Sequence, residues 1–321
     1  MLENFYILIP GNLFVKDGSI AFESLEEVFD IPIKQITDLY LLIDVKATPN
    51  ILKLIMDEGI IIHYFNMYEY YLGSLIPKKH KSSGKLIVNE VIHYNDENKR
   101  LFIAKEIVKA SLKNLNNVLK YYHRREKINY KEDFNLFINR INEAKTINKI
   151  MLIEAEFRKR YYYYFGLIVG LEDFTKHGKN ANDITNVLIN FLNSLLYSLM
   201  FSEIKKTNIS GQIGFVHELE HDRHPLIYDL ADIFKPIMVD RLIFRLLNRK
   251  QITNEDLVEG RLKKEAVKII FKEWDEQINT TIYHKQLKRN VSYRYLIRFE
   301  LYKLENHFTK NKKYKGFVYW W

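Results

Sequence analysis

Residues suited to binding a metal ion are concentrated in the stretch 214–236. His217 lies upstream of a helix that Pro225 begins, because proline is favoured in the first helical turn, where its missing N–H costs nothing. Asp229 and Asp232 are three residues apart and share a face of that helix. An imidazole with carboxylates suits Mg²⁺ or Mn²⁺ acting on phosphate esters. The alternative is a polar loop followed by an ordinary amphipathic helix, since charged residues usually face water.

A zinc protease motif overlaps the same stretch. His217, Glu218 and His221 match the H-E-x-x-H pattern, in which two histidines on one helix hold zinc and the glutamate activates water. The context argues against this chemistry, because glycines precede the motif and Pro225 follows it closely. Ile227 stands where the longer motif has its third histidine. A zinc protease is therefore the weaker interpretation of these residues.

A further carboxylate comes from a helix expected over residues 146–164. Glu154 and Arg158 are four residues apart, so they share a face of this helix, whereas Glu156 points elsewhere. A pair of this kind on a helix is usually a surface ion pair. Glu154 would nevertheless supply the carboxylate that a metal site near His217 still lacks.

The composition limits the compartment. The 321 residues include no cysteine, so disulfides and thiolate metal sites are excluded and a reducing compartment is indicated. No apolar run approaches the roughly 18 residues that a membrane helix needs. The N-terminus lacks the basic start and the cleavage site of a signal peptide. We therefore expect a cytoplasmic protein with no membrane segment.

The net charge of +9 is unevenly distributed along the chain. Residues 1–80 hold 6 Lys and Arg and 11 Asp and Glu, a net charge of −5, so the remaining residues carry +14. An acidic front and a basic body suggest two domains, the second of which meets a polyanion. A basic bias that serves only solubility is the alternative, because net charge alone is non-specific.

Two regions of the chain differ in their periodicity. Residues 1–76 form short β-prone runs separated by turn signals, which predicts strands. Residues 77–92 are basic and are expected to form a flexible linker. Residues 93–321 have helical periodicity. The sequence thus predicts an α+β fold, with a small β-rich N-terminal dimerisation domain followed by a larger all-α catalytic domain. The expected helices of the second domain cover about 100–125, 131–143, 146–164, 183–201, 225–249, 260–277 and 291–309.

Two further features have simple interpretations. His63 lies in an apolar run expected to form a buried strand, and we interpret it as an ordinary strand residue. The C-terminal residues 310–321 mix lysines with aromatic residues. This tail is expected either to dock on the core or to stack on nucleic acid.

Several short motifs occur together along the whole chain. The motifs are Glu154-Ala155 with Arg158 and Tyr161-Tyr162, Asp183 to Asn186, Gly214 to His217, Tyr228 to Pro236, and in the front half Pro10-Gly11, Ile31 to Ile33, Gly59-Ile60, His63 to Asn66 and Tyr70 to Gly73. In this combination the sequence resembles the CRISPR-associated adaptation endonucleases and integrases, the first of the two universal Cas proteins, which insert new spacers. Ala155 replaces the glycine that usually follows the family's glutamate.

The resemblance implies a set of site residues. Glu154, His217 and Asp232 would be the catalytic metal ligands for Mg²⁺ or Mn²⁺, with Asp229 and Arg158 as accessory residues. Together with Arg158, the nearby Arg241 and Arg245 are expected to hold DNA phosphates, contacts that position DNA without reading its sequence.

The resemblance also implies a reaction and partners. Spacer insertion is a transesterification, in which a DNA 3′-hydroxyl attacks a phosphodiester of the target. The substrates would be prespacer DNA and the CRISPR repeat. The partners would be a second copy of the chain and the small second universal adaptation protein. A catalytically silent nucleic-acid scaffold with the same basic surface is the alternative from another class, and metal-dependent DNA cleavage distinguishes the two.

Overall fold

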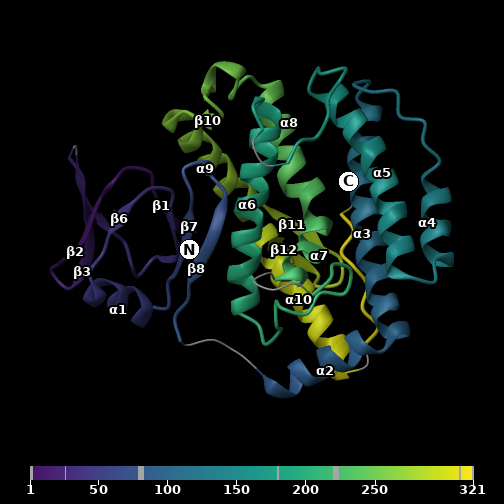
Figure 1. Ribbon diagram of the computed structural model, residues 1–321, viewed down its shortest axis with the longest axis horizontal. Helices are drawn as coiled ribbons and strands as arrows, with labels where there is room; N and C mark the ends of the chain where they lie inside the picture. Colours follow the sequence, from purple (N-terminus) through teal and green to yellow (C-terminus); the bar gives the residue numbers. More distant parts are fainter. Residues whose placement is uncertain are drawn as a thin grey trace.

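The computed structural model describes residues 3–25, 27–78, 83–178, 181–219, 224–310 and 312–319. A strand-rich N-terminal region lies beside a larger helical region (Figure 1). The expected α+β fold class, with a small β-rich region followed by a larger helical one, is confirmed. The exact domain boundaries remain predictions.

The N-terminal region contains two four-stranded sheets and one helix, α1 (Pro49–Asp57), which begins with a proline. In the order β1-β5-β7-β8, the first three strands are parallel and β8 is antiparallel to β7. The second sheet has the order β4-β3-β2-β6. The sequence did not predict the short strands β4 and β6. The strand bounds are β1 (Glu3–Ile7), β2 (Gly11–Lys16), β3 (Ser19–Glu23), β4 (Val28–Ile31), β5 (Ile36–Leu41), β6 (Val45–Lys46), β7 (Ile61–Phe65) and β8 (Tyr71–Leu75).

The range 77–92, expected to be a flexible linker, is helical in its second half. Helix α2 (Gly84–Asn95) begins after Ser83, whose hydroxyl accepts a hydrogen bond from the Leu86 N–H at 3.3 Å. This is a normal N-cap, which the flanking lysines concealed in the sequence. The helix buries Leu86 and Glu90 and packs against α3 and α10. Residues 79–82 lie outside the described part of the chain.

The second region is predominantly helical, with two short hairpins that the sequence did not predict. Where one helix was expected over 225–249, a π-helical turn, η1, separates α7 from α8. Pro236 lies in this turn, and proline cannot donate the helical N–H bond. The bounds are α3 (Glu97–Arg124), α4 (Phe134–Glu143), α5 (Ile147–Ile168), α6 (Ile184–Lys205), α7 (Pro225–Phe234), η1 (Lys235–Asp240), α8 (Arg241–Asn248), η2 (Asn254–Asp256), β9 (Leu257–Val258), β10 (Arg261–Leu262), α9 (Lys264–Asn279), β11 (Thr281–His284), β12 (Arg289–Ser292) and α10 (Tyr293–Lys310).

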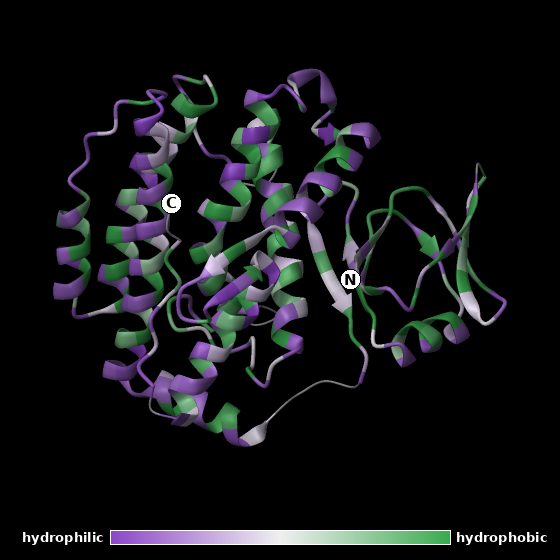
Figure 2. Cartoon of the chain, turned by 180° about the vertical axis from the view of Figure 1, so that it is seen from behind, coloured by the Kyte–Doolittle hydropathy of each residue, from purple (hydrophilic) through white to green (hydrophobic). Residues whose placement is uncertain are grey.

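Helix α6 is the central helix of this region. It is the one helix among the described residues that is long and apolar enough to cross a membrane, although no segment of this kind was expected from the sequence. However, 83% of its apolar window is buried inside the protein, against β8, α7 and α10. The peripheral helices instead alternate hydrophobic and hydrophilic residues around their circumference (Figure 2). The burial of α6 therefore identifies it as a core helix.

A buried polar network joins the two regions. Asp38 of β5 lies 3.0 Å from Nε2 of His63 on the neighbouring strand β7, and both side chains are fully buried. Ser202 of α6 donates to Asp38 Oδ1 at 2.5 Å, and Arg294 of α10 donates to Asp38 Oδ2 at 3.1 Å. His63 is thus a buried strand residue, as expected. Its acidic partner was missed because strand pairing, not sequence spacing, brings it close.

Candidate metal centre

The carboxylates of Glu154 and Asp232 meet at one arginine. Arg158, one turn after Glu154 on α5, donates from Nη2 to Glu154 Oε1 at 2.8 Å. The same nitrogen lies 3.2 Å from Asp232 Oδ2 on α7 and 3.1 Å from Ser111 Oγ on α3. Two carboxylates from separate helices therefore lie within 3.2 Å of a single nitrogen. Arg158 is a largely buried bridge rather than a surface ion-pair residue.

Asp229 organises the loop that carries His217. Its carboxylate accepts backbone N–H bonds from Phe215 at 2.6 Å, Val216 at 3.0 Å and His217 at 3.0 Å. It also lies 2.6 Å from Nδ1 of the His217 ring. Such a contact fixes the tautomer and orientation of an imidazole and leaves Nε2 as the nitrogen that can bind a metal. Asp229 is thus engaged as a positioning residue behind His217.

Gly214 allows this loop to approach α7 closely. A Cβ atom at Gly214 would lie 2.7 Å from Cβ of Pro225 and 3.2 Å from Oδ2 of Asp229. The first distance is shorter than carbon atoms tolerate without displacement. Glycine is therefore required here for packing, so that the backbone after it can reach the Asp229 carboxylate.

Burial and neighbouring charges shift the acidity of the cluster in different directions. Burial raises the pKa of Glu154, and Arg158 opposes that shift. Burial would also raise the pKa of Asp232, but Arg158 and Lys235 outweigh it and lower that pKa. Lys235 Nζ donates to Asp232 Oδ1 at 2.7 Å. The hydrogen bond with Asp229 raises the pKa of His217. Two cations thus hold Asp232 in its ionised form.

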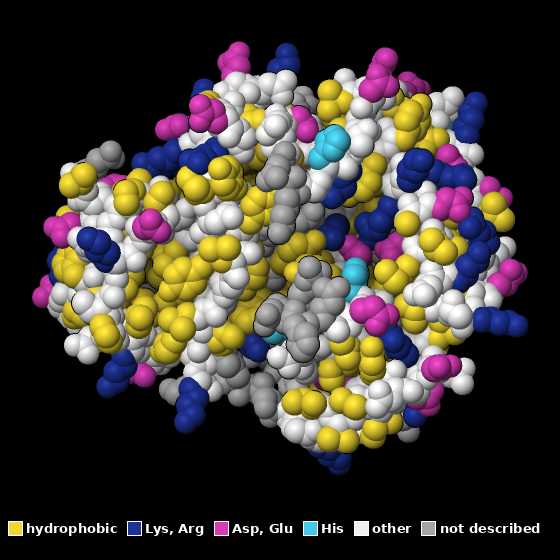
Figure 3. All heavy atoms as spheres, viewed as in Figure 1, with side chains coloured by type: hydrophobic (Ala, Val, Ile, Leu, Met, Phe, Trp, Pro, Cys, Tyr) yellow, Lys and Arg dark blue, Asp and Glu magenta, His cyan; other side chains and the backbone are white. Residues whose placement is uncertain are grey.

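The donor set suits a hard divalent cation. Glu154, Asp232 and His217 offer carboxylate oxygens and an imidazole nitrogen, ligands that Mg²⁺ or Mn²⁺ accepts. Within the described part of the chain, no three His, Asp or Glu side chains are arranged to hold one ion. Instead, Arg158 contacts one oxygen of Glu154, and Arg158 and Lys235 together contact both oxygens of Asp232. The residues fit the ion by type, and the ligand assignment remains a prediction. On the face of the helical region that Figure 3 shows, histidine, acidic and basic side chains gather near one another.

Comparison with known proteins decides the family. Residues 5–276 match the family model for "CRISPR associated protein Cas1". The chain belongs to the Cas1 family.

The similarity to individual Cas1 proteins extends over whole chains. The "CRISPR-associated endonuclease Cas1" of Fusobacterium nucleatum is 37% identical, with 100% of this chain and 98% of that protein covered. The "CRISPR-associated endonuclease Cas1 2" of Thermodesulfovibrio yellowstonii is 36% identical, with 100% of both covered. The solved structure of a Cas1 protein from Thermotoga maritima is 30% identical and has a TM-score of 0.86, covering 99% of this chain and 100% of that one. The resemblance inferred from the motifs is confirmed.

The helix that a zinc protease needs is not found at residues 217–219, the part of the H-E-x-x-H motif that the structure describes. Residues 211–219 form turns and bends rather than a helix. Glu218 lies 3.6 Å from Arg100. His221 lies outside the described residues. Because the zinc chemistry needs both histidines on one helix, the non-helical backbone at His217 argues against it in this Cas1 family member.

The remaining expected residues lie outside the carboxylate cluster. Arg241 and Arg245 belong to α8. Arg245 pairs with Glu273 of α9 at 2.9 Å, and Arg241 lies over the ring of Tyr121 at 5.8 Å. Their expected contact with DNA remains a prediction.

Two residues of the cluster, Ser111 and Lys235, were not predicted from the sequence. Lys235 precedes the proline in one of the Cas1 motifs, which was the available signal. Ser111 of α3 had no signal in the sequence, because only helix packing brings it to Arg158.

Proposed function

We propose that this chain is a metal-dependent DNA endonuclease and integrase that inserts new spacers into a CRISPR array. One observation carries the proposal. Glu154 and Asp232 share the Arg158 guanidinium. Beside them, the ring of His217 is oriented by Asp229. Membership of the Cas1 family supports the same activity.

The chemistry assigns a role to each residue of the cluster. Glu154, Asp232 and Nε2 of His217 would hold Mg²⁺ or Mn²⁺. When bound, that ion polarises a phosphoryl oxygen and favours the alkoxide form of an attacking 3′-hydroxyl. Arg158 and Lys235, released from the carboxylates, would hold non-bridging phosphate oxygens of the DNA. Asp229 keeps the His217 ring in the tautomer that leaves Nε2 free to bind the ion.

The partners follow from charge and exposed apolar surface. DNA, as prespacer and CRISPR repeat, would lie on the basic helical region, since the residues beyond 80 carry +14. A second copy would cover the N-terminal region, where Leu25, Val28 and Leu72 are 104%, 56% and 67% exposed. Hydrophobic atoms cluster on this part of the surface (Figure 3). The small second adaptation protein completes the assembly, which would work in the cytoplasm.

An integration assay tests the function. A fluorescent DNA end and a repeat-containing plasmid are incubated with this chain, the small partner protein and Mg²⁺ or Mn²⁺. We expect joined product with the wild type and none with Glu154→Gln or Asp232→Asn, or after chelation of the metal. DNA binding should persist in both variants. If the wild type binds DNA without cleaving or joining it under either metal, the silent scaffold is the correct interpretation.

A further inference from the structure

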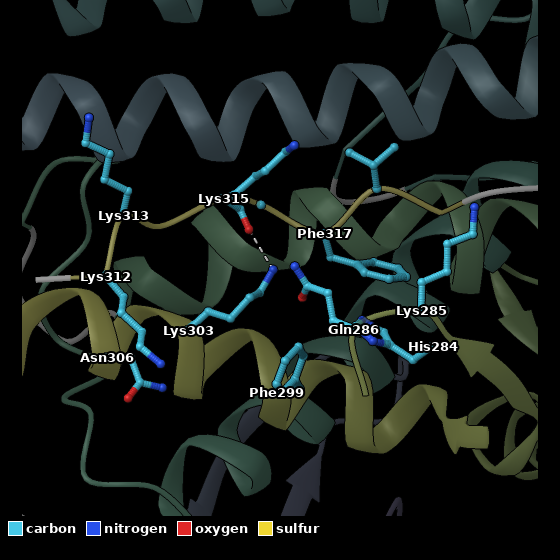
Figure 4. A pocket seen from close by; sticks show the side chains of 12 residues that line it. His284, Lys285, Gln286, Phe299, Lys303, Asn306, Lys312, Lys313, Lys315 and Phe317 are labelled. Atoms are coloured by element: carbon cyan, nitrogen blue, oxygen red, sulfur yellow. Dashed lines mark hydrogen bonds between the residues drawn. The ribbon is translucent and has the colours of Figure 1, made fainter. Parts of the chain in front are cut away.

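A basic pocket lies away from the carboxylate cluster, along the C-terminal segment 312–319. It has a volume of about 560 Å³ and lies between this segment, α10 and the turn between β11 and β12 (Figure 4). None of the described residues that line the pocket is acidic. The pocket therefore presents only positive or neutral side chains to a ligand.

The backbone of the C-terminal segment is held in place by buried hydrogen bonds. Tyr314 donates its hydroxyl hydrogen to Glu300 Oε1 at 2.5 Å, and the Phe317 N–H donates to the same oxygen at 3.1 Å. Asn114 of α3 donates to the Phe317 carbonyl at 3.0 Å. The described part of the tail thus docks on the core, which is one of the two arrangements expected from the sequence. It is a fixed wall of the pocket.

Gly316 brings this wall against α3. A Cβ atom there would lie 2.5 Å from Cβ of Ala110 and 2.8 Å from the carbonyl oxygen of Glu106. Only glycine permits so close a contact between the segment and the helix. The side chains of Tyr314 and Phe317 are buried, whereas Lys313 and Lys315, on either side of Tyr314, are exposed. Exposed lysines on a fixed backbone lose less freedom when they bind a ligand than lysines on a mobile tail.

The lysines of the pocket have two different roles. Lys303 belongs to its frame, because its Nζ donates to the Lys315 carbonyl at 2.7 Å (Figure 4) and pairs with the buried Glu300 at 2.5 Å. Lys312, Lys313 and Lys315 are exposed, and among the described residues no ion pair compensates their charge. The three exposed ammonium groups, here called the lysine rim, are therefore available to an anion.

The geometry points to the phosphodiester backbone of DNA as the ligand. Lys313 and Lys315 lie on either side of the buried Tyr314, and their side chains leave the same side of the fixed segment (Figure 4). Two cations held on one side of a backbone can contact phosphates of one DNA strand. Gln286 and Asn306 add amide donors beside the rim. We propose that the lysine rim holds a stretch of DNA backbone at a contact separate from the metal centre.

Helix α7 separates the two sites. Asp232 faces Arg158 on one side of α7, while the ring of Phe234 stacks on Phe317, 5.8 Å between centroids, at the other. DNA held at the rim would therefore pass behind the helix that carries the carboxylate cluster. The choice of DNA as the polyanion rests on the proposed integrase function. The positive charge of the pocket and its fixed backbone are observed independently of that function.

A charge-matched pair of variants tests the rim. One full-length variant carries Lys312→Gln, Lys313→Gln and Lys315→Gln. The control carries Lys263→Gln, Lys268→Gln and Lys272→Gln, three exposed lysines at α9 of the same helical region. Binding of a labelled 40-base-pair duplex is measured with a chelator present, over a series of salt concentrations, after thermal unfolding has verified that both variants are folded.

We expect the rim variant to bind about tenfold more weakly, with a shallower salt dependence, because each lost phosphate contact lowers the slope by roughly 0.9. The control should weaken binding much less, because it removes the same charge without removing the phosphate contacts proposed at the rim. Equal weakening in both variants would show a general charge effect and overturn the proposal. Because no metal is present, this outcome is separate from the proposed function, which fails only if the metal-loaded wild type does not cleave or join DNA.

Chemical footprinting of the wild type identifies the ligand class. Lysine acetylation followed by mass spectrometry is carried out with duplex DNA, with inorganic phosphate and with a poly-glutamate peptide. Protection of Lys313 and Lys315 by DNA, and by neither of the others at equal charge concentration, supports the proposal. Protection by the acidic peptide or by phosphate, without protection by DNA, contradicts it.

Discussion

Three acidic residues of the candidate centre have different partners and therefore different chemistry. Asp229 is 1% exposed and accepts three backbone N–H groups besides contacting His217. Asp232 lies between Arg158 and Lys235. Glu154 receives both its bonds from Arg158. Arg158 and Lys235 thus keep Asp232 ionised. Burial raises the pKa of Glu154 against the opposing effect of Arg158, whereas Asp229 uses its carboxylate to hold a loop.

The two histidines of the H-E-x-x-H sequence should differ sharply in mutants. His217→Ala should abolish metal-dependent DNA cleavage, because it removes a ligand of the ion that acts as the Lewis acid. His221→Ala should leave cleavage largely intact. A gel assay with Mn²⁺ and a linear duplex measures both variants. Equal loss in the two would restore a site built on the histidine pair.

Replacing Asp229 should weaken metal binding without removing a ligand. Asp229→Asn loses the charge that orients His217, and such a change typically costs 10–100-fold in metal affinity. The same contact raises the pKa of His217. Because a metal needs the neutral imidazole, losing the contact should also move the acid limb of the cleavage profile to lower pH.

Metal titrations of cleavage at several pH values measure both effects of Asp229→Asn. Asp133→Asn, which alters an exposed helix cap on α4, is the control. A weaker metal affinity with an unmoved acid limb would show that Asp229 acts only on the stability of the loop.

At the scale of elements, α2 is attached to the helical core by a buried carboxyl group, that of Glu90. Glu90 is 1% exposed and accepts the backbone N–H of Ser210 at 3.1 Å, just upstream of the loop that carries His217. Burial raises the pKa of Glu90 to about 8. The Glu90 side chain is therefore protonated in the folded protein at neutral pH and charged in the unfolded chain.

Stability should consequently fall with rising pH because of Glu90. Between its unfolded pKa, near 4.5, and about 8, the folded state holds a proton that the unfolded state has lost, so unfolding becomes easier as pH rises. Glu90→Gln is neutral throughout and retains an acceptor for Ser210. From pH 5 to 8 the variant should gain stability relative to the wild type, by at most about 4 kcal/mol.

Urea unfolding at pH 5, 6.5 and 8 measures the effect of Glu90→Gln. Glu143→Gln, an exposed position at the end of α4, should show no such trend. A constant difference between the wild type and the Glu90→Gln variant across the pH range would contradict the assignment.

At the scale of the whole molecule, buried charges couple the N-terminal region to the helical one. Arg294 of α10 reaches Asp38 of β5 at 3.1 Å and Glu203 of α6 at 3.9 Å. Arg298 donates to Glu203 at 2.6 Å. Neither carboxylate is exposed. The two regions therefore share a charge network whose partners come from both, and separating them would leave buried charges uncompensated.

Removing the central cation of this network should destabilise the whole chain. Arg294→Met leaves the buried Asp38 without its ion-pair partner, a change that typically costs 3–5 kcal/mol. Denaturant unfolding of the full chain provides the measurement, with Arg249→Met at an exposed position as the control. The double variant Asp38→Asn with Arg294→Met should recover part of the loss. A loss no larger than that of the control would show that the regions are held together by apolar packing alone.

The local sequence pattern was sufficient to predict which segments are helices or strands, and which side chains could bind a metal ion. Hydrophobic periodicity and turn residues act over a few neighbours, so α5, α6 and α7 and the strands β5 and β7 were predictable from the sequence. The short motifs along the whole chain, taken in combination, were sufficient for the resemblance to the family.

Contacts between distant segments depended on the tertiary structure. Helix packing places the Arg158 side chain between Glu154 and Asp232. Parallel strand pairing brings Asp38 to His63. The loop after Gly214 folds onto α7, so that Asp229 binds backbone and imidazole rather than water. Each contact joins side chains whose spacing in the sequence carries no period, because it arises from how whole elements pack.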